Sequence, residues 1–149
     1  MRTKHLEGGA AIGLSPLGRL AIAIGRRSVH DFMEFGRERG LSLSQLSALQ
    51  ALYHRGPLAV GELGRFAPGG RSALTQLADG LVGAGLATRS EAEDDRRRKI
   101  VALTPEGEAL VRDGIARRTA WAEDAAKGLD PETLRAAARL ADRLDELEA

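Results

Sequence analysis

Residues 93–107 read EDDRRRKIVALTPEG, and this stretch carries most of the information about the fold. The charged run leads directly into KIVAL (99–103), a short apolar segment that is typical of a strand. TPE (104–106) then begins a helix, because threonine caps, proline fits the first helical position and glutamate suits the positive end of the helix dipole. Since LATR (86–89) is a second strand-like run, the sequence predicts a β-hairpin with a charged loop, followed by a helix that runs to Gly128.

Two long helices are predicted upstream of this hairpin. SP (15–16) is a cap followed by a first-position proline, and apolar residues then recur at helical spacing as far as Gly40. Ser42 and Gln45 form a capping-box pattern for a second helix, which stops at GP (56–57).

Two shorter segments lie between the second helix and the hairpin. AVGELGRFA (59–67) has helical character, but it contains two glycines and lacks a capping side chain at Ala59, so it must rely on tertiary packing. The turn PGG (68–70) precedes RSALTQLADGLVG (71–83), an amphipathic helix. A helix pair with a glycine-containing turn, followed by a hairpin, is the order of a winged helix-turn-helix. The polar face of the predicted helix 71–83 carries Ser72, Thr75, Gln76 and Asp79.

The last predicted helix begins at DPE (130–132) and keeps a near-heptad apolar stripe that one small chain cannot easily hide. A partner subunit is therefore expected. We predict a mainly α fold with a small β-hairpin wing, a winged helix-turn-helix plus a helical dimerisation region, as one domain over 1–149. The DNA-binding part would span 42–104, and the dimerisation helices 15–40 and 105–149. The stripe consists of Leu134, Ala137, Ala141, Leu144 and Leu147.

The composition gives no global argument for nucleic acid or membranes. Lys and Arg number 22 against 21 Asp and Glu, a net charge of +1, so any basic surface must be local. No run approaches the ~20 apolar residues of a membrane span. Pro16 and Arg19 interrupt the apolar N-terminal stretch, which argues against a signal peptide. We expect a cytoplasmic protein with no membrane partner.

Catalysis, metals and cofactors find little support. The chain has no cysteine, which excludes disulfides, thiolate zinc sites and thiol redox switches within it. His5, His30 and His54 share no metal-ligand spacing, and we find no phosphate-binding loop, dinucleotide fingerprint or nucleophile elbow. We expect no metal, no cofactor and no enzymatic activity. For His30 we weigh a place in the lining of a ligand pocket against a packed or solvated side chain, and favour the latter. The acidic residues of 91–95 are interpreted as balancing the arginines.

The order of elements, together with GLATRSEAEDDRRRKIVALTPEG (85–107), resembles the MarR family of winged helix-turn-helix transcriptional regulators. The resemblance covers the chain from about Pro16 onward. It implies a homodimer whose first, fifth and sixth helices interlock, with two winged domains set on DNA. It further implies that the helix from Arg71 enters the major groove and that Arg97, at the wing tip, enters the minor groove. Asp95 would hold Arg97 through a carboxylate–guanidinium pair.

The chemistry of the residues agrees with this resemblance. A planar guanidinium fits a narrow, electronegative minor groove, and neighbouring cations neutralise phosphates. Gln76 and Gly80 stand where relatives often have arginine, and the charge of Asp79 would repel phosphates unless it is paired. The expected DNA-binding residues are Arg71, Ser72, Ala73, Thr75, Gln76, Arg96, Arg97, Arg98 and Lys99, with Asp95 as a wing-stabilising residue.

Our primary hypothesis is a homodimeric, sequence-specific DNA-binding regulator that represses from a pseudo-palindromic operator. Release by a small-molecule effector is a further expectation, for which the sequence identifies no ligand-binding residues. The alternative is a winged-helix protein-interaction module with weak or no DNA binding. Gln76 and Gly80 favour the alternative, and the basic run 96–99 opposes it. The operator and the regulated genes are left open.

Overall fold

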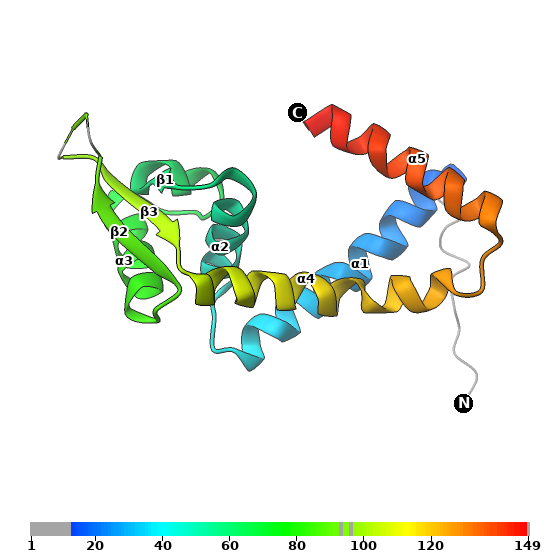
Figure 1. Cartoon of the computed structure of the whole chain (residues 1–149), viewed down its shortest axis with the longest axis horizontal. Helices are drawn as coiled ribbons and strands as arrows, with labels where there is room; N and C mark the ends of the chain where they lie inside the picture. Colours follow the sequence, from blue (N-terminus) through cyan, green and yellow to red (C-terminus); the bar gives the residue numbers. More distant parts are fainter. Residues whose placement is uncertain (1–12, 93, 96, 149) are drawn as a thin grey trace.

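The computed structural model describes residues 13–92, 94, 95 and 97–148 (Figure 1). The predicted fold class is confirmed: the chain is mainly helical and carries a winged helix-turn-helix. Among the described residues, no helix is long and apolar enough to cross a membrane. In chain order the elements are α1 (Pro16–Glu38), α2 (Leu43–Arg55), β1 (Leu58–Ala59), the 3₁₀ helix η1 (Val60–Arg65), α3 (Arg71–Gly83), β2 (Ala87–Glu91), β3 (Lys99–Leu103), α4 (Pro105–Ala126) and α5 (Pro131–Glu148).

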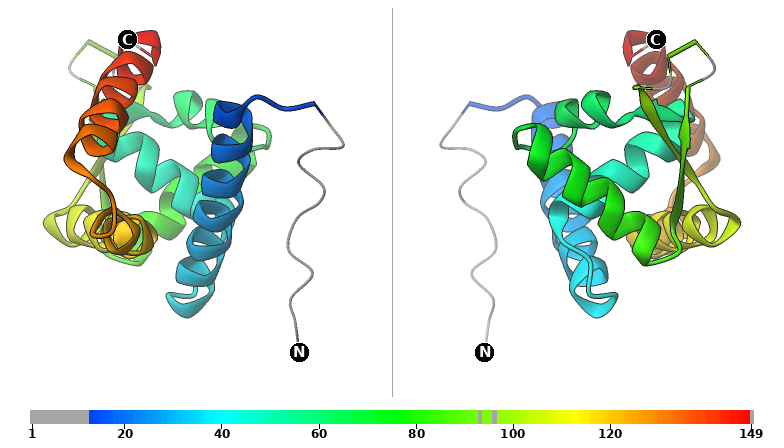
Figure 2. Two further views of the ribbon diagram at one scale, coloured as in Figure 1. Left: turned by 90° about the vertical axis from the view of Figure 1, so that its right-hand side faces the viewer. Right: turned by 90° about the vertical axis from the view of Figure 1, so that its left-hand side faces the viewer.

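The elements form a winged part and an extended helical part. In Figure 1, α2, η1, α3 and the sheet gather at one end, and α4 leads away from them across α1. Helix α5 then turns back, and Figure 2 shows that it stands apart from α1. The helical part therefore leaves much of its surface uncovered by its own chain.

The sheet has three antiparallel strands in the order β1-β3-β2, so the predicted hairpin gains a third strand. Strand β1 pairs Leu58 with Val101 and Ala59 with Ile100. Two residues are too few to show the alternation of apolar and polar side chains by which a strand is recognised in a sequence. Strand β1 was therefore missed.

The hydrophobic core lies where four elements of the winged part meet. Leu49 of α2, Leu63 of η1, Leu81 of α3 and Val101 of β3 are fully buried. Burial of each such side chain contributes about 1.5–3 kcal/mol. Leu63 anchors η1, as expected for a glycine-containing segment without a side-chain cap.

The predicted helix starts are confirmed by their hydrogen bonds. Ser42 and Gln45 form the capping box: the Gln45 backbone N–H donates to Ser42 Oγ at 3.2 Å, and the Ser42 N–H donates to Gln45 Oε1 at 2.8 Å. At α4, the Gly107 N–H donates to Thr104 Oγ1 at 3.0 Å, and that hydroxyl donates to the Gly85 carbonyl at 2.7 Å. Thr104 thus caps α4 and ties it to the loop before β2.

Two ion pairs join α1 to α4, the two helices that leave the winged part. Arg117 donates two hydrogen bonds to the Glu38 carboxylate, and Arg39 pairs with Asp113. The hydrogen bonds from Arg117 are the main reason that the pKa of Glu38 lies below its ordinary value. These pairs hold α1 and α4 together next to the winged part.

Candidate nucleic-acid interface

The start of α3, the segment 59–62 and the wing, meaning β2, β3 and the loop between them, line one open groove, which we call the wing groove. Helix α3 contributes Arg71, Leu74 and Thr75. Cations and one carboxylate come from the wing, so residues that are distant in sequence meet here. The wing residues of the groove are Arg89, Asp95, Arg97, Arg98 and Lys99.

Helix α3 presents the polar face that the sequence predicted. Leu74, Ala78 and Leu81 are buried, whereas Ser72 and Gln76 are exposed. Because the apolar residues fix the rotation of the helix, the polar side chains must face outward. Ala73 is also exposed, and Thr75 is half-buried at the edge of the wing groove.

The turn before α3 depends on one glycine. Gly69 has a φ of +143°, a conformation that L side chains rarely adopt. A Cβ at this position would lie 2.7 Å from the Cβ of Ala73. The PGG turn can therefore bring the chain into α3 only with glycine here.

Asp79, on the outer face of α3, is paired. Its Oδ1 lies 2.6 Å from Arg89 Nη1 on strand β2. The sequence raised the question of how this carboxylate could be tolerated beside phosphates, but it did not identify Arg89 as the partner. The outer face of α3 therefore carries a carboxylate that is already paired with a cation.

Asp95 contacts Arg97, as expected, but it binds the backbone N–H of Arg97 and not the guanidinium. Asp95 Oδ1 accepts a hydrogen bond from the backbone N–H of Arg97 at 2.9 Å, and the Asp95 carbonyl accepts from the Arg98 N–H at 2.8 Å. An aspartate two residues before an N–H readily closes such a turn. Asp95 shapes the backbone of the wing tip and leaves the guanidinium of Arg97 free of a carboxylate within the described chain.

Other cations of the wing pair with the acidic run, as the sequence indicated. Lys99 Nζ lies 2.6 Å from Glu91 Oε1, and Arg98 Nη1 lies 3.3 Å from Asp94 Oδ2. Exposed ion pairs of this kind contribute about 0–1 kcal/mol. A phosphate could therefore replace either carboxylate at small cost. Arg96, a further expected contact, lies outside the described residues.

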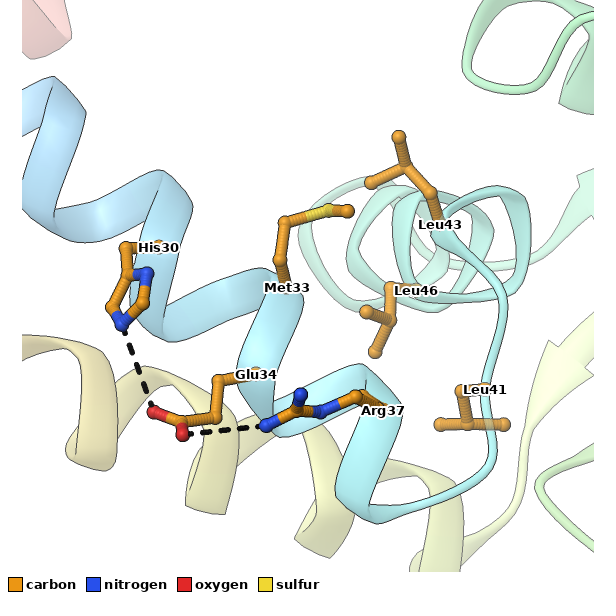
Figure 3. A pocket seen from close by; sticks show the side chains of 7 residues that line it. All are labelled: His30, Met33, Glu34, Arg37, Leu41, Leu43 and Leu46. Carbon is orange, nitrogen blue, oxygen red and sulfur yellow. Dashed lines mark ion pairs between the residues drawn. The ribbon is translucent and has the colours of Figure 1, made fainter.

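A second hollow, the α1–α2 pocket, has a volume of about 530 Å³ and is lined by residues of α1, of α2 and of the loop between them (Figure 3). It brings His30, Met33, Glu34 and Arg37 of α1 to the leucines at the start of α2. Glu34 lies between His30, at 4.0 Å, and Arg37, at 3.6 Å. The His30 side chain is 72% exposed, so it is solvated, and it also borders this pocket. The leucines are Leu41, Leu43 and Leu46.

His30 also forms a cluster that its sequence spacing to other histidines did not reveal. Ligand atoms of His30, Asp31 and Glu34 lie within 4.8 Å of one another. Both carboxylates are already paired, Asp31 with Arg27 at 3.1 Å and Glu34 with Arg37. A metal ion would have to compete with both arginines for the negative charge of these carboxylates, so the cluster is better described as an ion-pair network.

Comparison with known proteins gives one family match. The model of the MarR family matches residues 41–99, the region from the start of α2 to the start of β3. No curated protein matches the sequence significantly.

Several solved structures share the fold. The transcriptional regulator Tm0710 from Thermotoga maritima is 28% identical, with 89% of this chain and 92% of that chain covered and a TM-score of 0.71. A MarR family protein from Bacillus stearothermophilus is 22% identical, with 96% and 99% covered and a TM-score of 0.72. BpsR from Bordetella bronchiseptica, whose DNA binding is regulated by 6-hydroxynicotinic acid, is 23% identical, with 88% and 94% covered and a TM-score of 0.53.

Proposed function

Residues 41–99 carry the winged helix of the MarR family of transcriptional regulators, and from this premise we propose that the chain is a homodimeric DNA-binding regulator that represses from a pseudo-palindromic operator. The observation that carries the proposal is the wing groove. It joins the exposed start of α3 to the cations of the wing, so that one surface offers both a helix for base edges and arginines for the phosphate backbone.

Helix α3 is the reading element in this proposal. An α-helix fits the major groove, and residues of its first turns approach base edges. Ser72 and Gln76 are exposed there, with Thr75 at the edge of the wing groove. Gln76 can make two hydrogen bonds to an adenine edge, whereas Arg71 is suited to a phosphate.

The wing supplies charge. Arg97 is exposed at the tip, and the Asp95 turn sets the course of its backbone, so that its guanidinium can enter a minor groove. Arg98 and Lys99 would contact phosphates once Arg98 has left Asp94 and Lys99 has left Glu91. Because these exchanges offset part of the gain, we expect a moderate non-specific affinity.

Dimerisation is proposed through α1, α4 and α5, that is, 15–40 and 105–149, with 42–104 as the DNA-binding part of a single domain. Leu134 and Leu144 of α5 are 40% and 52% exposed in the single chain. Apolar surface of this extent on soluble helices marks an interaction site. Helix α1 adds a second uncovered set of large apolar side chains, namely Leu17, Leu20, Ile22, Ile24, Val29 and Met33.

A small-molecule effector completes the proposal, and the α1–α2 pocket supports it. The pocket lies where a proposed dimerisation helix meets the first helix of the winged part (Figure 3). A ligand wedged between Met33 of α1 and Leu46 of α2 would change the angle between these two helices. In a dimer, that change would alter the distance between the two copies of α3. The regulation of BpsR by 6-hydroxynicotinic acid is a precedent in a protein of the same fold.

The second candidate is a protein-interaction module with weak DNA binding. The observation in its favour is that Arg89, Arg98 and Lys99 are already paired with carboxylates. Salt-dependent DNA binding separates the two candidates, because counterion release is characteristic of phosphate contacts.

The test measures fluorescence anisotropy on an operator selected from random duplexes and on a scrambled duplex, at several salt concentrations. Arg97→Ala should weaken binding to both duplexes and lower the salt slope by about one unit. Gln76→Ala should cost about 1–3 kcal/mol on the operator only.

The matched control is Arg135→Ala, which removes an exposed arginine from α5 and should change neither quantity. If the folded wild type binds neither duplex at low salt, the DNA-binding function is refuted and the interaction module takes its place.

A further inference from the structure

We propose that Arg89 is a positioning residue for DNA recognition, because its ion pair with Asp79 fixes the wing at one distance from the reading helix α3. The inference rests on the proposed DNA-binding function and deepens it. Arg89 would act through α3, and its own contact with DNA would be secondary.

The position of Arg89 on its strand supports this role. Side chains alternate along a strand, so Arg89 lies on the same face of β2 as Ala87, which is 3% exposed and part of the core beside α3. Its partner in register on β3 is the fully buried Val101. Arg89 therefore emerges from the sheet where the core ends, on the side of α3.

The pair differs from the other ion pairs of the wing in the elements that it joins. Its burial is similar to that of Lys99–Glu91, since the Arg89 side chain is 29% exposed and that of Lys99 is 36% exposed. Asp79, the partner of Arg89, belongs to a different element, whereas the partners of Arg98 and Lys99 lie within the wing itself. Within the described chain, the Arg89–Asp79 contact is the side-chain hydrogen bond that links α3 to the wing strands.

The wing needs such a link. Residues 88–91 are exposed, so the outer part of β2 gains no support from the core. The tip carries Arg97, which must reach one DNA groove while α3 occupies the next. A loose wing would have to lose its freedom on binding, and that ordering would weaken the complex.

The sign of one substitution distinguishes positioning from simple electrostatics. Asp79 lies four residues after Thr75 and three after Gln76, so it shares their face of the helix. If only charge matters, Asp79→Asn removes a repulsion of phosphates and should tighten DNA binding. If the ion pair positions the wing, the same substitution breaks the link to Arg89 and should weaken DNA binding.

Glu91→Gln is the matched control. Glu91 is also a carboxylate paired at 2.6 Å with a cation of the wing groove, and it is 53% exposed against 57% for Asp79. Its partner lies on the adjacent strand of the wing, so removing its charge breaks no contact with α3. Lys99 could then contact a phosphate without first leaving a carboxylate, so binding to the operator should be equal or tighter.

The experiment has a DNA arm and a DNA-free arm. On the selected operator, Asp79→Asn should weaken binding at least about fivefold, the lower end of coupling between linked sites, with no rise in salt slope. Glu91→Gln should bind equally or more tightly. In the free protein, hydrogen exchange at the amides of β2 should be faster in Asp79→Asn than in Glu91→Gln, at an unchanged midpoint of thermal unfolding.

A double variant tests whether the link itself matters. Asp79→Arg combined with Arg89→Asp restores an ion pair in reverse, so it should recover most of the affinity lost in Arg89→Gln. Tighter binding by Asp79→Asn, or a double variant as weak as Arg89→Gln, would overturn the proposal. Should the wild type fail to bind DNA, the function is refuted, and the exchange rates alone then decide whether the pair holds the wing.

Discussion

Replacement of Gly107 by alanine should be the most damaging glycine-to-alanine change among the described residues. Gly107 is buried in the first turn of α4, where α4 crosses the loop before β2. A Cβ at this position would lie 2.0 Å from the Leu86 carbonyl oxygen and 3.2 Å from a methyl group of Leu103. That carbonyl accepts the N–H of Thr104 at 3.1 Å, so it cannot retreat without losing a backbone hydrogen bond.

The cost follows from this geometry. Forcing one methyl group into a well-packed site costs about 1–3 kcal/mol, and here the obstacle is backbone. We expect the free energy of unfolding to fall by about 3 kcal/mol or more, which for a chain of this size lowers the thermal midpoint on the order of 10 °C. The assay is urea and thermal unfolding followed by circular dichroism, at one protein concentration for all variants.

Gly83→Ala provides the matched control. Gly83 ends α3, and a Cβ there would meet no atom within 4 Å. Because alanine is the better helix former, this variant should be as stable as the wild type or slightly more stable. A Gly107→Ala variant whose unfolding free energy stays within about 0.5 kcal/mol of wild type, the usual range for a neutral surface change, would refute the close contact between α4 and Leu86.

Two further predictions concern acid sensitivity and assembly. Arg117 lowers the pKa of Glu38, so the stabilisation that this carboxylate gives is complete above its ordinary pKa of 4.5 and is lost as the pH falls through the lower folded value. In urea unfolding from pH 6 to about pH 3, the free energy of unfolding should therefore fall less in Glu38→Gln than in the wild type. Part of the fall should remain, because Thr133 lowers the pKa of Asp130 in the same way. An equal loss in both proteins would contradict the assignment. Leu144→Glu should prevent dimerisation, so that light scattering no longer gives twice the 15.9 kDa chain mass. Arg139→Glu, on the opposite face of α5, should leave the dimer mass unchanged. A dimeric Leu144→Glu variant would exclude the Leu144 face of α5 from the interface.

Local signals in the sequence predicted most of the helices well. The capping box at Ser42 and the TPE start at 104–106 each depend on residues within one turn, and both are found as expected. Helix α3 was likewise predicted, because the PGG turn and the period of its apolar residues leave few alternatives. The signals are strong here because the interactions that they report are themselves local.

The parts that were missed depend on tertiary register. Strand β1 is formed only because β3 lies beside it, and Arg89 meets Asp79 only because β2 packs on α3. For Asp95 the partner residue, Arg97, was predicted, but the partner atom was not. The choice between the backbone N–H and the guanidinium is set by the course of the turn. The residues of the wing were thus predictable as a group, and their pairings were not.

Hydroxyl-radical footprinting of the wild-type protein on its selected operator tests the central claim most directly. A dimer with two reading helices on one side of DNA should protect two half-sites whose centres lie one helical turn apart, ~34–36 Å, or a multiple of it. Protection by the wings should flank each half-site in the minor groove. A single protected patch, or no protection at low salt by a protein that scatters light as a dimer, would contradict the account.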